Sequence, residues 1–96
     1  MVLFGSYLSC TRPGTFSLDH VVEHTPEGQT MRAESVDRDS ARGRILWGQM
    51  YRRLRGAAAL VARRCGLDCI VSEGDVRDAR GLPVRDVTSE LVQQLR

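Results

Sequence analysis

The chain has 96 residues, of which 42% are hydrophobic and 27% are charged, and its net charge at neutral pH is +2. This length holds a single domain, residues 1–96, and the composition excludes an intrinsically disordered chain. All fourteen basic residues are arginine, a bias that we attribute to a GC-rich coding sequence. The small net charge argues against a protein that coats nucleic acid through bulk electrostatics.

The N-terminal third of the chain predicts an antiparallel β-meander. Residues 2–9 are rich in strand-forming side chains, residues 11–14 have the composition of a turn, and side chains alternate in character through residues 15–24. The tetrapeptide at residues 25–28 (TPEG) has Pro and Gly at the positions that a type I turn prefers. We therefore expect residues 29–36 to return as a third strand.

The longest periodic segment, residues 39–65, predicts one amphipathic helix. Its apolar residues recur at steps of three and four, which places them on one face of a helix that lies on a sheet. Ser40 and two nearby aspartates are candidate N-caps. Gly66, followed by the apolar Leu67, is typical of a left-handed glycine that ends a helix.

The rest of the chain predicts two further elements around an ambiguous segment. Residues 68–73 read as a buried strand, Gly74 and Asp75 as a turn, and residues 76–84 as either a loop or a short edge hairpin. An apolar stripe at Val87, Leu91 and Leu95 predicts a short C-terminal helix. The expected fold is an α+β two-layer sandwich, an antiparallel β-meander with one long basic helix packed across it, in the order β-β-β-α-β-(β)-α.

The positive charge is concentrated on the long helix. Residues 38–64 carry a net charge of +7, whereas residues 1–37 carry −3 and residues 65–96 carry −2. Several arginines lie eleven residues apart, close to three helical turns, so they should form rows along the helix axis. The side chains that we expect to bind a partner are Arg42, Arg44, Arg52, Arg53, Arg55, Arg63, Arg64 and Tyr51. The alternative is a solvated face that acids of the flanking segments neutralise.

Catalytic and metal-binding patterns are weak. His20 and His24 are four residues apart, which on the expected strand separates them by about 13 Å, too far to chelate one metal ion. The sequence has no phosphate-binding loop, nucleophile elbow or dinucleotide-binding glycine pattern. We therefore expect no enzymatic activity, no cofactor and no metal site. The three cysteines have no framework spacing and favour reduced thiols in a cytoplasm.

These features favour a small non-enzymatic binding protein, a regulator or inhibitor of phage or mobile-element origin that engages a protein partner. The polar segment 75–85 is expected to assist the helix. One alternative is a nucleic-acid-binding module that uses the Arg-rich helix 38–64, and another is a homodimer. The apolar N-terminus is short and lacks a basic leading region, and no apolar run reaches the roughly 20 residues that span a bilayer. We expect a soluble cytoplasmic protein that does not bind membranes.

Overall fold

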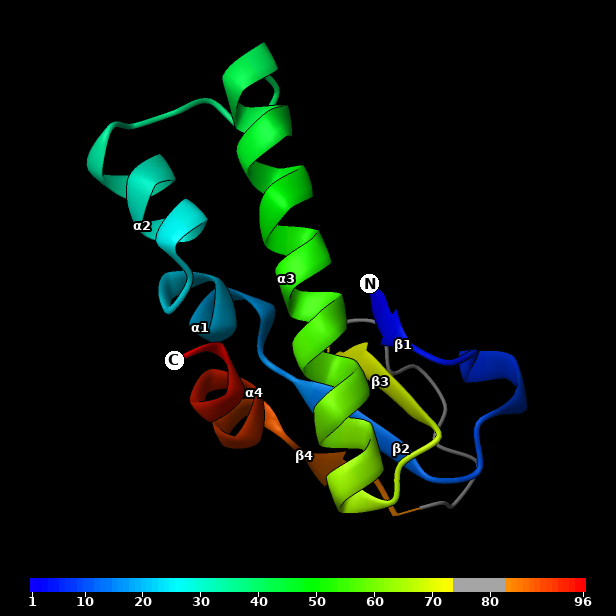
Figure 1. Cartoon of the computed structure of the whole chain (residues 1–96). Helices are drawn as coiled ribbons and strands as arrows, with labels where there is room; N and C mark the ends of the chain where they lie inside the picture. The colour runs from blue at the N-terminus through cyan, green and yellow to red at the C-terminus, as the bar shows by residue number, and fades with distance from the viewer. Residues whose placement is uncertain (74–82) are drawn as a thin grey trace.

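A computed structural model describes residues 1–73 and 83–96, in which one long helix lies across a four-stranded mixed sheet (Figure 1). The strands are β1 (Val2–Phe4), β2 (Pro13–Phe16), β3 (Cys69–Ser72) and β4 (Arg85–Asp86). The helices are α1 (Leu18–Glu23), α2 (Pro26–Ala33), α3 (Ala41–Cys65) and α4 (Thr88–Leu95), and a 3-10 turn, η1, spans Tyr7–Ser9. The α+β class is confirmed.

The sheet is not the expected antiparallel meander. Its strand order is β1-β3-β2-β4, with β1 antiparallel to β3 and β2 parallel to both β3 and β4. Parallel neighbours need a long crossover connection, and the three helices between β2 and β3 provide one. The first strand is also shorter than residues 2–9, and Pro13 and Gly14, which were assigned to a turn, belong to β2.

The expected strands at residues 15–24 and 29–36 are wrong beyond Phe16, because the chain there forms α1 and α2. Thr25 is the N-cap of α2: its hydroxyl accepts a hydrogen bond from the Gly28 amide at 3.0 Å, and Pro26 occupies the first helical turn. Gly28 is needed for close packing, since a Cβ there would lie 2.0 Å from the Val22 carbonyl oxygen. The TPEG sequence therefore starts a helix that packs tightly on α1.

The long helix agrees with its prediction at both ends. Ser40 is the N-cap, and its hydroxyl accepts a hydrogen bond from the Gly43 amide at 3.0 Å. Gly66 ends the helix with a left-handed φ of 66°, and its amide and that of Leu67 donate to the Ala62 carbonyl. With 25 residues, α3 is roughly 37 Å long.

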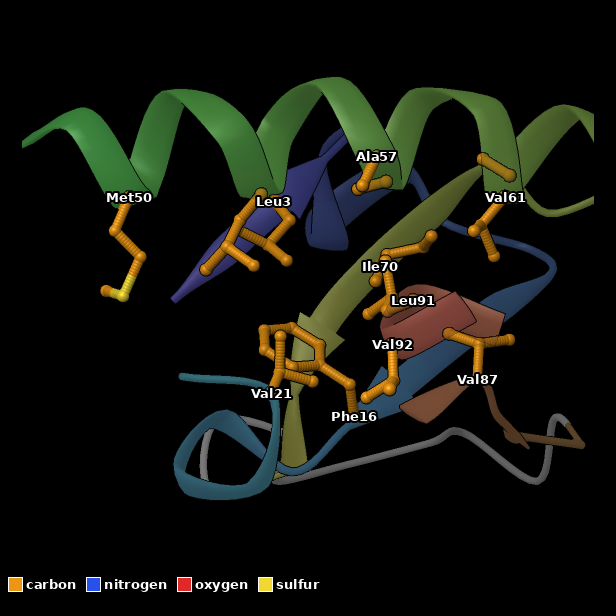
Figure 2. Packing of buried hydrophobic residues seen from close by; sticks show 13 residues of the cluster. Leu3, Phe16, Val21, Met50, Ala57, Val61, Ile70, Val87, Leu91 and Val92 are labelled. Atoms are coloured by element: carbon orange, nitrogen blue, oxygen red, sulfur yellow. The ribbon is translucent and has the colours of Figure 1, made fainter. Parts of the chain in front are cut away.

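One apolar core fills the space between α3, the sheet and α4. Figure 2 shows Met50, Ala57 and Val61 pointing from α3 toward the side chains of the sheet and α4. The strand predicted at residues 68–73 is confirmed as β3, whose four residues are all buried. The C-terminal helix is confirmed as α4, which buries Leu91 and Val92, and Val87 just before it is also buried.

The cysteines contradict the expectation of reduced thiols. Cys10 and Cys69 form a disulfide that ties the segment before β2 to the start of β3, and Cys65 is the free cysteine. The cysteine argument for a cytoplasmic location therefore does not hold, and the location stays a prediction.

Asp68 reinforces the same junction. Its carboxylate accepts hydrogen bonds from the Thr11 amide at 2.9 Å, the Thr11 hydroxyl at 2.7 Å and the Arg12 amide at 2.7 Å. These donors, the Thr11 hydroxyl first, lower the pKa of Asp68 to about 2.

The turn expected at Gly74 and Asp75 and most of the segment 76–84 lie outside the described residues. β4 follows this segment as a two-residue edge strand. Asp86, at its end, accepts hydrogen bonds from the Thr88 amide and hydroxyl where α4 begins.

Candidate partner-binding face of the long helix

The structure places all seven arginines of the expected site on α3 with exposed side chains. At about 100° per residue they form three rows along the helix, as the spacing of eleven predicts. The rows are Arg42, Arg53 and Arg64; Arg44 and Arg55; and Arg52 and Arg63. The rows differ in what lies beside them, and this difference defines the candidate site.

The first row is largely neutralised because α2 lies alongside it (Figure 1). Glu27 forms an ion pair with Arg53 at 3.0 Å, and Glu34 forms a two-pronged pair with Arg42. Burial raises the pKa of Glu27, but the hydrogen bond and charge of Arg53 outweigh it, and the net pKa lies below the usual value. The hydrogen bond from Arg42 likewise lowers the pKa of Glu34. For Arg42 and Arg53, the alternative of a face neutralised by flanking acids is therefore the better description.

The other two rows have no acidic partner among the residues that the structure describes. Arg44, Arg52 and Arg63 make no ion pair there, and the Arg55 guanidinium lies 5.7 Å from the centre of the Tyr51 ring. Arg64, at the end of the first row, is also without an ion pair in the described part of the chain. The uncompensated charge of α3 thus lies away from α2.

Apolar side chains and glycines interrupt these unpaired arginines. Two apolar side chains of α3 face solvent: Ile45 is 62% exposed and Leu60 is 41% exposed. A Cβ added to Gly48 or Gly56 would meet nothing within 4 Å, so packing within the chain does not require either glycine. We call this surface the outer face of α3; its residues are Arg44, Ile45, Gly48, Arg52, Arg55, Gly56, Leu60 and Arg63.

The two aromatic residues of α3 lie at the margin between the outer face and the core. Trp47 packs against the core, and the Arg38 guanidinium covers its ring at 3.6 Å from the ring centre. Tyr51 is half-buried, and its hydroxyl donates a hydrogen bond to the Val2 carbonyl at 3.1 Å. Tyr51 therefore joins α3 to β1 and contributes to the expected binding surface only as the ring beneath Arg55.

Sequence reasoning singled out the arginines but missed the exposed Ile45 and Leu60. Their angular positions could have identified them. At about 100° per residue Ile45 falls opposite the main apolar arc, beside Gly56, and Leu60 lies on the flank of the helix that carries Arg53 and Arg64. An apolar residue on the polar side of a helix marks a candidate contact.

Comparisons of the chain with protein-family models, curated proteins and solved structures find no match. Among the described residues, the helices are either too short or too polar to cross a bilayer. The proposals below therefore rest on the geometry and chemistry of the chain itself.

Proposed function

We propose that the protein is a non-enzymatic binding module whose outer face of α3 docks on an acidic surface of a protein partner. The observation that carries the proposal is the contrast between the arginine rows: acids of α2 neutralise Arg42 and Arg53, whereas the arginines of the outer face have no acidic partner among the described residues. Guanidinium groups without internal partners suit the carboxylates of another molecule, which they bind in a two-pronged geometry.

The apolar residues of the outer face favour a protein over nucleic acid. Ile45 and Leu60 lie among the arginines and offer nothing to a phosphate backbone, but they suit the apolar centre of a protein interface. Gly48 and Gly56 lower the surface between them, so that a partner backbone can approach α3 closely. Arginine is itself enriched at protein interfaces and among the residues that dominate their binding energy. The more specific hypothesis of a regulator or inhibitor stays a prediction.

The test is a capture experiment with charge-reversed variants. The immobilised chain is exposed to a bacterial lysate with and without nuclease, in parallel with Arg52→Glu/Arg63→Glu and with the control Arg32→Glu/Arg96→Glu. The control makes the same change in net charge away from the outer face. The proposal expects a discrete protein that survives nuclease, is retained by the control and is lost with the outer-face variant.

Other outcomes would replace this proposal with one of its alternatives. Recovery of nucleic acid alone, falling steeply as salt rises, would assign the arginines to phosphate binding, because each neutralised phosphate releases counterions. A doubled mass in solution that Arg52→Glu/Arg63→Glu abolishes would identify the partner as a second copy of the chain. Equal capture by both variants would remove the outer face from consideration.

A further inference from the structure

The two histidines of the chain lie together on α1, contrary to the strand-based expectation that separates them. His20 is in the helix and His24 is its C-terminal cap, one turn later. Their ring centres are 5.0 Å apart, and the ring planes meet at 60°. Two imidazoles four residues apart on a helix are the pair that can reach a single metal ion.

The separation of the rings fits a shared metal ion. A zinc–imidazole bond is about 2.0–2.1 Å long, which puts the metal about 3.2 Å from each ring centre. Two imidazoles at a tetrahedral angle then have their ring centres about 5 Å apart, close to the distance found here. The separation of the ring centres is therefore compatible with chelation once a nitrogen of each ring faces the metal ion.

The surroundings supply room and further oxygen ligands. A pocket of about 380 Å³ between α1 and α4 is lined by His20, His24, Ser89, Val92, Gln93 and Arg96. Ser89 and Gln93 are themselves one turn apart on α4, across the pocket from the histidines. Their hydroxyl and amide oxygens can ligate a metal directly or hold its water ligands. Arg96 also lines this pocket, and the positive charge of its side chain opposes a cation and weakens the site.

We propose that His20 and His24 form a two-histidine site for a divalent transition-metal ion, with oxygens of Ser89, Gln93 or water completing the coordination shell. Imidazole ligands suit Zn²⁺, Ni²⁺ and Cu²⁺, and the general order of affinities places Cu²⁺ above Zn²⁺. The site lies on α1 and α4 and is independent of the proposed role of α3. It would join two helices that otherwise meet through side-chain packing.

The test is a calorimetric titration of the full chain with Zn²⁺ and with Cu²⁺ in a non-reducing buffer. The disulfide then removes Cys10 and Cys69 as ligands. The proposal expects one equivalent of metal, and at least about tenfold weaker binding in His20→Ala and in His24→Ala. His20 is exposed, so its substitution leaves the core intact. Arg96→Gln should tighten binding, because it removes the opposing charge.

Two measurements distinguish this site from adventitious binding. Cys65→Ser, which removes the free thiol, should bind Zn²⁺ as the unaltered chain does. The electron paramagnetic resonance spectrum of the Cu²⁺ complex should show two equatorial nitrogens, reduced to one by His20→Ala. The proposal is overturned by absence of saturable binding, by affinity in the histidine variants equal to that of the unaltered chain, or by loss of binding in Cys65→Ser.

Discussion

Replacing Gly48 and Gly56 by alanine should stabilise the folded chain. Glycine in a helix interior is less favourable than alanine by about 1 kcal/mol, and the added methyl groups meet nothing within 4 Å. The double variant should therefore gain about 2 kcal/mol, on the order of 10 °C in melting temperature for a domain of this size. If the outer face of α3 requires close approach of a partner, the same variant should bind that partner less well.

Urea unfolding followed by far-ultraviolet circular dichroism measures the gain in stability. Gly43→Ala is the control, for which a loss of stability is expected. A Cβ at Gly43 would lie 2.1 Å from the Asp37 carbonyl oxygen, so this substitution should destabilise the start of α3. Loss of stability in Gly48→Ala/Gly56→Ala would show that these glycines meet intramolecular constraints. Increased stability with unchanged partner binding would refute the idea that they admit the partner.

The remaining predictions concern the core and the junction between β2 and β3. Cys10→Ser/Cys69→Ser removes a crosslink between residues 59 positions apart. The free energy of unfolding, measured by urea titration, should fall by about 4 kcal/mol. An unchanged unfolding midpoint would show that the disulfide does not constrain the unfolded chain. Leu54→Ala removes a fully buried side chain and should cost about 3–5 kcal/mol by the same assay, whereas a loss below 1 kcal/mol would contradict the described core. The folded-state pKa of Asp68 lies at about 2, below its usual 3.8, so its stabilising contribution is present above pH 4 and is lost as pH falls toward 2. The stability difference between the unaltered chain and Asp68→Asn should narrow over that interval, and a difference independent of pH would exclude the charged hydrogen bonds as its source.

The long helix was predictable because its signals agree. The apolar period, the cap at Ser40 and the left-handed Gly66 all specify the same element, and the structure has each of them. The buried strand β3 and the stripe of α4 were also correct, because each packs its apolar residues in the way that its pattern indicates.

The N-terminal half was harder to predict because its helices are short. α1 has six residues and α2 has eight, so a period of two and a period of 3.6 both fit the side chains of residues 15–24. Thr25 followed by Pro26 suits the start of a turn and the start of a helix equally well. The close packing of Gly28 against α1, which the local sequence does not reveal, accompanies the helix. The parallel pairing of β2 with β3 depends on contacts between residues more than 50 positions apart, which local patterns do not encode.

The candidate site was predictable in its charges but not in their compensation. The eleven-residue spacing of the arginines was enough to predict their rows. The ion pairs that neutralise Arg42 and Arg53 depend on the position of α2, which carries Glu27 and lies beside Glu34. The strand that was wrongly expected at residues 15–24 concealed the approach of His20 to His24. In both places an error in secondary structure hid which side chains lie next to one another.

The central claim, that the outer face of α3 contacts a protein partner, is tested most directly by photocrosslinking. A photoreactive phenylalanine derivative is placed at Ile45 or Leu60, both exposed on that face, and at Ala33, which is exposed on α2. The account predicts that the partner crosslinks from positions 45 and 60 and not from position 33. Crosslinking from position 33 alone, or to nucleic acid from positions 45 and 60, would contradict it.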